Sequence, residues 1–409
     1  MKSILIVTEI FDIGGLETHI RCEINSLTKL GWIVHLVCGK KFKNDLVPQS
    51  VASLTTGLCI GAEATARDLV ETVETLRSLI RSHGINVVHA HPFTSLVPSL
   101  IAAELERVQF TVSLHGPISI GSGYLGPLYD FLFYSAVIPS ANPLIVVSEE
   151  TEKLAEPYLA NQNILIQPNA IDVDEFCQLE KPELLDERWI VVSRLDDFKI
   201  VGIFEFVKFA KAAGLTGVRI VGDGNAELKL RENIEQASLS NFVDFLGART
   251  DIPQLLQNCG GVAGMGRVVL EGLFSYKPTC LIGYDGVKGL VDLNLIKTAS
   301  LSNFSGRNLH NISELNFIEQ INDIHLISAF ENYAYVFQNF NGLVIWETFS
   351  SLINDTKVLR PSLVTAIYLY ITYSLQADNL PYLFSSELYW QIGRLVNSPK
   401  YINEALLAN

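Results

Sequence analysis

The chain has 409 residues, of which 48% are hydrophobic and 18% charged. This length and composition suit two globular domains, each able to bury its own core, and exclude a largely disordered chain. The net charge of −14 argues against nucleic acid as a partner, although helix N-termini and a few placed cations can still bind a diphosphate in an acidic protein.

Cysteine usage and hydropathy bear on location. The six cysteines are scattered without a Cys-x-x-Cys pair, which is typical of reduced residues in a cytoplasmic protein. The opening run MKSILIVTEIFD is expected to be a first strand and not a signal peptide. The apolar tract from Leu363 to Leu375 has 13 residues, whereas a spanning helix needs roughly 20. We expect it to be a buried helix, or a contact surface for a protein partner or for the inner face of a membrane.

In the first half of the chain, short β-branched runs alternate with helical patterns, as in a parallel sheet with crossover helices. Strands are expected at residues 3–9, 33–39, 86–91, 110–116, 143–148 and 163–169. Helices are expected from Thr18 to Leu30 and from Ala66 to His83, each followed by a capping glycine. We predict an N-terminal Rossmann-like domain over residues 1–168.

The turn after the first strand contains Gly14 and Gly15, in EIFDIGGLETHI. A dinucleotide site would have Gly-x-Gly-x-x-Gly here and an acid at the end of the second strand, and this sequence has neither. An NAD-dependent oxidoreductase is therefore disfavoured. The glycine pair is either a tight turn or a place where the backbone approaches a ligand phosphate or sugar.

Three histidines lie near strand ends in this half. His89 and His91 share one face of a strand, and His115 follows a neighbouring strand. Three histidines could suggest a metal site, but no carboxylate or cysteine joins them at ligand spacing. We predict no metal, and expect histidines of the core or cleft, with His115 as a candidate for contact with a sugar.

The second half repeats the alternation after an acidic, proline-containing linker at residues 169–187. Strands are expected at 189–195, 218–224, 243–248, 260–265 and 279–286, and helices at 202–213, 225–238 and 251–258. We predict a second Rossmann-like domain at 188–340 and a helical segment at 341–409 that packs partly on the N-terminal domain. The predicted fold class is α/β, with two doubly wound domains facing across a cleft where ligands lie beyond the carboxyl ends of the strands.

The stretch GVAGMGRVVLEGL is the strongest site signal in the second half. Gly264 and Gly266 would expose backbone N–H groups at a helix start, which suits a diphosphate. Glu271, on the second turn, could accept hydrogen bonds from a ribose diol, or could form an i,i+4 surface pair with Arg267.

Two cations complete this predicted site. Arg194 and Lys199, in SRLDDFK, would reach the rim of the first strand of the second domain, or would be solvated loop cations. Gly222, in VGDGNAEL, is a weaker signal because Gly-Asp-Gly is often only a turn.

Together the motifs GGLETH, VVHAH, TVSLHG, LIVVSEET, QPNAIDVDEF, VVSRLDDFK, VGDGNAEL, FLGARTDIPQLL and GMGRVVLEGL resemble the family-4 retaining glycosyltransferases of GT-B fold. The resemblance runs from Ser3 to about Gly286. It implies transfer of a sugar from a nucleotide-diphosphate donor, without a metal and with retention of anomeric configuration. It places the donor on the C-terminal domain and a saccharide, lipid-linked or protein acceptor on the N-terminal domain.

The resemblance also assigns roles to single positions. Arg194 and Lys199 would neutralise the departing diphosphate, His115 would contact the donor sugar, and Glu271 would hold the ribose. Residues 248–250 would line the base. The other donor-binding positions are Gly15, Gly222, Arg249, Thr250, Gly264, Met265, Gly266 and Arg267.

One position departs from the family pattern. The family usually has a Glu eight residues before the ribose acid, where this sequence has Ala263, and Arg267 replaces a usual apolar residue. The departure leaves donor choice open and supports an alternative: a catalytically impaired protein that binds nucleotide or stabilises another transferase. An epimerase or phosphorylase of the same architecture is a further alternative, but no phosphorylase cofactor lysine is evident.

Overall fold

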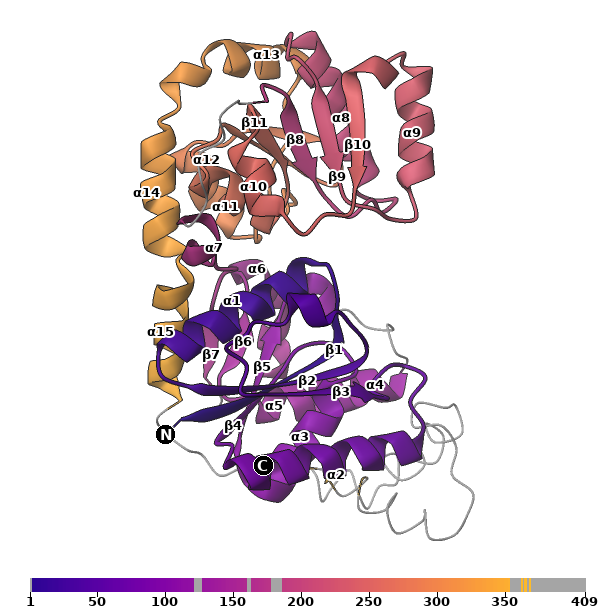
Figure 1. The fold of residues 1–409 in the computed structure, drawn as a ribbon, viewed down its shortest axis with the longest axis vertical. Coiled ribbons are helices and arrows are strands. Elements are labelled where there is room, and N and C mark those ends of the chain that lie inside the picture. Colours follow the sequence, from indigo (N-terminus) through magenta and orange to yellow (C-terminus); the bar gives the residue numbers. More distant parts are fainter. Residues whose placement is uncertain are drawn as a thin grey trace.

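The computed structural model describes residues 2–120, 127–159, 163–177, 186–353, 362, 364, 365 and 368. These form two α/β domains stacked along the long axis of the molecule, with α14 (Ala329–Asn339) and α15 (Gly342–Leu352) running down one side from the C-terminal domain to the N-terminal domain (Figure 1). The predicted pair of doubly wound α/β domains is confirmed.

The N-terminal domain is built on a seven-stranded sheet with the order β3-β2-β1-β4-β5-β6-β7 and parallel pairing throughout. The strands are β1 (Ser3–Phe11), β2 (Ile33–Phe42), β3 (Ser53–Leu58), β4 (Val87–Ala90), β5 (Gln109–Leu114), β6 (Leu144–Val146) and β7 (Ile164–Ile166). Its helices are α1 (Gly15–Lys29), α2 (Ala66–His83), α3 (Leu96–Glu106), α4 (Pro127–Leu132), α5 (Ile138–Ser140) and α6 (Glu149–Ala155).

Local sequence explains why α2 matches its predicted bounds. Thr65 and Asp68 form a reciprocal capping box at its start, which satisfies backbone donors that the first turn leaves free. Gly84, with φ 58°, ends the helix in the left-handed conformation that glycine adopts without strain.

The C-terminal domain has a six-stranded sheet of order β10-β9-β8-β11-β12-β13, in which only the β12–β13 pair is antiparallel. The strands are β8 (Trp189–Val192), β9 (Val218–Val221), β10 (Val243–Gly247), β11 (Gly261–Gly264), β12 (Thr279–Ile282) and β13 (Val287–Leu290). The helices are α8 (Ile200–Ala212), α9 (Glu227–Gln236), α10 (Ile252–Gln257), α11 (Arg267–Phe274), α12 (Leu293–Ser300) and α13 (Glu314–Asn322).

Both sheets have a switch point, where the chain reverses its direction of strand addition. In the N-terminal sheet it lies between β1 and β4, and in the C-terminal sheet between β8 and β11. Loops at the carboxyl ends of such strand pairs leave a crevice in which α/β proteins bind ligands.

The chain crosses between the domains twice at one place. The first crossing leads into the short helix α7 (Val173–Cys177) and the second leads from α14 into α15. Ile171 donates its N–H to the carbonyl of Phe340 (2.7 Å), and Gly342 donates to the carbonyl of Ile171 (2.9 Å). The two crossing segments are therefore hydrogen-bonded side by side.

After the second crossing, α15 lies on the N-terminal domain against α1. Trp346 and Phe349 are buried in the same apolar cluster as Ile20 and Ile24 of α1. No helix among the described residues is both long and apolar enough to cross a membrane. The tract 363–375 lies outside the described residues except for Val364, Thr365 and Tyr368, which are helical and buried.

Two strands were not predicted. β3 (Ser53–Leu58) carries threonines and a glycine and is only partly buried at the sheet edge, so it lacks the apolar run by which the other strands were found. β13 (Val287–Leu290) follows β12 after a turn with Gly286 at φ 155° and pairs back on it, which interrupts the strand–helix alternation.

Candidate active site

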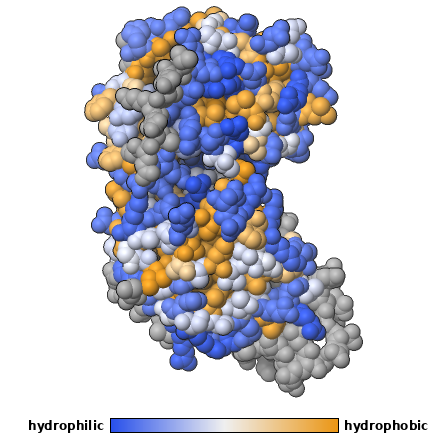
Figure 2. All heavy atoms as spheres, in the orientation of Figure 1, coloured by the Kyte–Doolittle hydropathy of each residue, from blue (hydrophilic) through white to orange (hydrophobic). Residues whose placement is uncertain are grey.

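The candidate site lies where the molecule is hollowed at its waist between the two domains (Figure 2). On the C-terminal side, β11 ends at Gly264 and α11 begins at Arg267, so the bare stretch Gly264–Gly266 joins a central strand to a helix N-terminus, as predicted. Among the described residues, the amides of Arg267 and Val268 have no hydrogen-bond acceptor. These free N–H groups at the positive end of the helix suit an anion.

The two glycines of this turn serve different ends. A Cβ on Gly264 would come within 2.8 Å of Cγ1 of Val268, so the strand end packs closely on the helix. Gly266 has φ 64° and ψ −135°, a conformation open essentially to glycine, and nothing lies within 4 Å of its missing Cβ. Its N–H is already used, because it donates to the carbonyl of Phe304 (2.8 Å).

Arg194 and Lys199 are brought together by a carboxylate that the sequence analysis did not single out. Nε of Arg194 lies 2.8 Å from Oδ2 of Asp196, and Nζ of Lys199 lies 3.5 Å from the same oxygen. The side chain of Arg194 is 68% exposed and that of Lys199 only 18%. Desolvation lowers the pKa of Lys199, and the charge of Asp196 opposes that shift. Arg194 is thus a solvated loop cation, the alternative that the sequence left open, whereas Lys199 is mostly buried.

Glu271 and Arg267 form the i,i+4 pair that the sequence left open, but it is not a surface pair. Nε of Arg267 lies 3.6 Å from Oε1 of Glu271, with the side chains 9% and 11% exposed. Desolvation raises the pKa of Glu271, and the charge of Arg267 opposes it. Arg267 also donates from its guanidinium to the carbonyl of Ala170 (2.5 Å), in the segment that crosses between the domains.

Ala263 is buried within the apolar core beside Val191 and Cys280. Its side chain supplies a methyl group to the packing of the sheet. The described site therefore has one carboxylate on this strand–helix unit, Glu271, where the resembled family has two.

The remaining predicted donor positions lie at other strand ends. Gly222 has φ 127°, and a Cβ there would meet the carbonyl oxygen of Ser193 at 1.9 Å, so the close packing of two strand ends requires glycine. Arg249 and Thr250 are exposed after the edge strand β10, where Arg249 forms two hydrogen bonds to Asp251. β10 is separated from β11 by β9 and β8.

On the N-terminal side, Gly15 is the first residue of α1, and nothing lies within 4 Å of its missing Cβ. Glu17 is buried at the start of the same helix, and a Cβ on Gly14 would clash with its carboxylate at 2.4 Å. Desolvation raises the pKa of Glu17. The contact at Gly14 involves only the movable end of the Glu17 side chain, and Gly15 has open space, so packing requires glycine at neither position.

A carboxylate joins two of the three histidines, contrary to expectation. Glu23 of α1, fully buried, lies between His89 (Nδ1 to Oε1 2.6 Å) and His91 (Nε2 to Oε2 3.1 Å). The expectation that no carboxylate accompanies these histidines was wrong, because Glu23 reaches them from a helix 66 residues away in sequence. The ligand-capable atoms of Glu23, His89 and His91 lie within 4.8 Å of one another, a spacing that would admit a metal ion, although here both histidines hydrogen-bond to Glu23.

His115 extends this cluster to the cleft. Its Nε2 lies 2.9 Å from Nδ1 of His91, and the residue is half-buried, whereas His91 is fully buried. Desolvation, with the charges of His91 and His89, lowers the pKa of His115 well below its usual value, and Arg267 of the other domain adds to that shift. The charge of Arg267, on the predicted donor side, therefore acts on the pKa of His115.

Direct contacts tie the two domains together beside this site. Arg307 pairs with Glu150 through two hydrogen bonds (2.9 and 2.6 Å). Asn169 accepts at 3.1 Å from the ring of His19 and donates at 2.9 Å to the side chain of Asn303.

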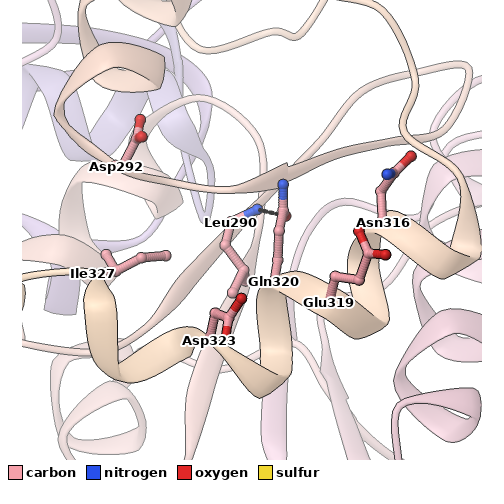
Figure 3. Close-up of a pocket in the computed structure, with 7 residues that line it drawn as sticks. All are labelled: Leu290, Asp292, Asn316, Glu319, Gln320, Asp323 and Ile327. Atoms are coloured by element: carbon pink, nitrogen blue, oxygen red, sulfur yellow. Dashed lines mark hydrogen bonds between the residues drawn. The ribbon is translucent and has the colours of Figure 1, made fainter.

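Two depressions in the C-terminal domain do not belong to this site. One, of about 370 Å³, is lined by Asp292, Glu319 and Asp323 among others (Figure 3). It lies near Leu290, which pairs with the first half of β12, so it opens toward the amino ends of the parallel strands. Three carboxylates there would repel a diphosphate.

Several of these partners could not be singled out in advance. Asp196 is part of SRLDDFK, where its place between the two cations is the one available signal. Glu23 and Asn169 lie on a helix and in a linker, and their contacts are long-range, so no sequence spacing marks them.

Comparisons with known proteins agree with this architecture. Residues 13–175 match the family Glycosyltransferase Family 4. No curated protein matches the sequence significantly. The expected resemblance to family-4 glycosyltransferases is thereby confirmed over much of the N-terminal domain.

Solved structures cover most of the chain. HepE from Anabaena in complex with UDP and glucose has a TM-score of 0.63 at 17% identity, covering 86% of this chain and 100% of that one. TarM from S. aureus, in a complex that includes UDP, has 0.65 at 11%, covering 87% and 100%. Sucrose-phosphate synthase from Thermosynechococcus elongatus has 0.60 at 15%, covering 86% and 98%. These likenesses confirm the GT-B fold.

Proposed function

We propose that this chain of GT-B fold is a retaining, metal-independent glycosyltransferase. It moves a sugar from a nucleotide-diphosphate donor to a saccharide, lipid-linked or protein acceptor in glycan biosynthesis. The observation that supports this best is the convergence at the switch point of the C-terminal sheet. The loop after β8 supplies Arg194 and Lys199 there, and the loop after β11 supplies the free amides that open α11.

These groups match the charge that develops during transfer. As the bond from the anomeric carbon to the diphosphate breaks, negative charge accumulates on the leaving oxygen and the sugar becomes oxocarbenium-like. Fixed cations and helix N–H groups aimed at that oxygen lower the barrier without a protein nucleophile. In this proposal Glu271 holds the ribose, Arg249 and Thr250 lie along the base, and Gly222 shapes the neighbouring loop.

The opposite side of the cleft would hold the sugar and its acceptor. His115 lies at the carboxyl end of β5 and Gly15 at the start of α1, beside the switch point of the N-terminal sheet. Retention and metal independence are proposed from the resemblance to family-4 enzymes. UDP is the first base to test, because HepE and TarM are solved in complexes with UDP.

The test is a thermal-shift screen followed by an activity assay. A nucleotide that binds the folded state raises the melting temperature, so UDP, GDP and their sugars are compared first. The donor that binds is then incubated with saccharide and lipid-linked acceptors, and the anomeric configuration of the product is read by NMR. Inversion in the product, or no shift with any nucleotide, would reject the proposal.

Ala263 favours a second candidate, a catalytically impaired protein that binds nucleotide or stabilises another transferase. A chain that binds UDP tightly, yet neither hydrolyses nor transfers any donor sugar alone, would support it. Activity that appears only with a second transferase would do the same.

We also propose a cytoplasmic protein, in which peripheral contact with a membrane or a protein partner involves the C-terminal segment. Five cysteines have side chains that the structure describes, namely Cys22, Cys38, Cys59, Cys259 and Cys280; all five are free, and four of them are buried. This fits a reducing compartment.

A further inference from the structure

A continuous chain of hydrogen bonds joins buried Glu23 to His115 in the cleft. The carboxylate of Glu23 contacts Nε2 of His91 at 3.1 Å, and Nδ1 of His91 contacts Nε2 of His115 at 2.9 Å. Glu23 and His91 are fully buried, so water does not compete for these bonds. Glu23, at the inner end, has a fixed position on α1, and His115, at the outer end, lies toward the other domain.

Hydrogen-bond chemistry dictates where each proton lies. A carboxylate only accepts, so the nitrogen of His91 that faces Glu23 must carry a proton. Desolvation lowers the pKa of His91 to about 4, so its ring is neutral near pH 7 and carries one proton. Its other nitrogen, Nδ1, is then an acceptor, and it must receive the proton from Nε2 of His115.

The carboxylate at the inner end is held ionised. Desolvation opposes ionisation, but the charge of His89 and hydrogen bonds from His89 and His91 bring the pKa of Glu23 to about 2. His89 also contacts Oγ of Ser113 through its second ring nitrogen (2.9 Å). Both oxygens of Glu23 thus have a partner. Because Glu23 can only accept, it fixes the direction of donation along the hydrogen-bond chain, from His115 to His91 to Glu23.

Helix α15, which follows the second crossing between the domains, covers this chain of hydrogen bonds. Phe349 of α15 stacks on His89 with 5.7 Å between ring centroids, and Trp346 lies edge-on to His19 at 5.6 Å. Both aromatic residues are fully buried. Aromatic cover on this side excludes solvent that could otherwise reorient the imidazoles.

We propose that Glu23 and His91 are positioning residues that hold His115 in its Nε2–H tautomer, so that Nδ1 offers a lone pair to the cleft. Among the described residues no group hydrogen-bonds to that Nδ1. The inference rests on the proposed function for the identity of the ligand, a donor sugar. It then deepens that function: the sugar atom that faces His115 must be a hydrogen-bond donor, such as a hydroxyl, and not a carboxylate or phosphate oxygen.

The experiment compares two substitutions of one residue. His91→Asn places an oxygen acceptor near the position of Nδ1, whereas His91→Phe keeps a ring of similar shape without an acceptor. The tautomer of His115 is read by ¹⁵N NMR on protein labelled at histidine, without any ligand. Turnover and KM for the donor are measured on the same samples, and circular dichroism checks folding.

The wild-type protein and His91→Asn are expected to show a protonated Nε2 and an unprotonated Nδ1 in His115. His91→Phe should show a mixture of tautomers and a fall in kcat of about tenfold, the worth of one hydrogen bond, with a smaller change in KM. If His91→Phe fails to fold, the wild-type spectrum alone still decides the tautomer.

Three results would overturn the inference: a protonated Nδ1 in wild-type His115, an unchanged tautomer in His91→Phe, or stoichiometric metal on the Glu23 cluster in the purified protein. The spectra need no substrate. A wild-type protein with the expected tautomer but no transferase activity would therefore reject the proposed function and leave the hydrogen-bond chain intact.

Discussion

Arg267 lies 3.6 Å from Glu271, one turn along α11, and both side chains are about nine-tenths buried. The guanidinium also holds the carbonyl of Ala170 in the segment between the domains. The residue that the sequence marks as unusual is thus committed to two structural contacts, and the carboxylate expected to hold a ribose already has a cationic neighbour.

Replacement of Arg267 by Leu should therefore destabilise the protein. It leaves Glu271 buried without a counter-charge, which costs about 3 kcal/mol when one partner of a buried pair is lost. The double variant R267L/E271Q should recover part of that loss. Urea unfolding of wild type, both single variants and the double variant measures the coupling.

Arg231 and Glu227 on α9 provide the control, because they have the same i,i+4 spacing but are more exposed, at 48% and 29%. R231L should cost less than about 1 kcal/mol. If R267L and R231L lowered the free energy of unfolding equally, burial would not determine the strength of the Arg267–Glu271 pair.

Removal of either predicted phosphate cation should reduce turnover. Lys199→Ala and Arg194→Ala each delete one stabiliser of the departing diphosphate, with an expected loss of roughly a hundred- to a thousandfold in kcat. Lys208 is exposed on α8, the helix that begins directly after Lys199, and Lys208→Ala serves as control. Wild-type turnover in both site variants, with folding intact, would remove these residues from the mechanism.

Two glycines should respond differently to alanine. At Gly222 a Cβ would lie 1.9 Å from the carbonyl oxygen of Ser193, so G222A should unfold the domain or shift its strands. Gly266 has open space, and G266A should cost only the backbone strain of about 1–3 kcal/mol. Chemical denaturation of both variants measures the difference, and a milder loss for G222A would contradict the packing argument.

Stability should fall as the solution is acidified below neutrality. Unfolded His91 takes up a proton near pH 6.5, but the folded residue does so only near pH 4 because it is desolvated. Between these values the unfolded chain binds more protons, so lower pH favours unfolding by about 1.4 kcal/mol per pH unit for such a histidine.

Glu23 adds to this acid sensitivity at lower pH. Its folded pKa of about 2 lies below the ordinary value of 4.5, so its stabilisation is complete above pH 4.5 and is lost as pH falls toward 2. Urea midpoints measured from pH 7 to 4 for wild type and His91→Asn test the histidine contribution. Parallel curves for the two proteins would show that His91 does not titrate in this way.

Chelation should leave transfer unchanged. In the proposed mechanism cations of the protein and helix amides take the role of a metal, so activity in excess EDTA should equal that in buffer. Loss of activity that zinc or magnesium restores would refute metal independence.

Periodicity predicted most of the fold, because buried strands and amphipathic helices leave local patterns that survive in any context. It found α2 to the residue and the turn before α11, where glycine is needed for backbone geometry. It missed β3 and β13, whose pairing depends on neighbours in the sheet and not on their own composition.

The candidate site was predictable only in part. Cations and glycines next to strands could be placed, since parallel strands bring their carboxyl ends to one edge. Glu23 could not be placed beside His89, because that contact depends on the angle at which α1 crosses the sheet. Likewise, the burial of the Arg267 pair depends on the crossing segment, which lies 97 residues away at Ala170.

The paired crossing at Ile171 and Asn341 has a mechanical consequence. The two polypeptide segments that connect the domains are hydrogen-bonded to each other at the crossing. We therefore expect this connection to act as a double-stranded hinge, which is stiffer than a single linker. Bending about the line through both segments keeps their hydrogen bonds, whereas twisting or sliding would pull them out of register. We therefore expect any opening of the cleft to follow a restricted path, on which the same faces meet again at each closure.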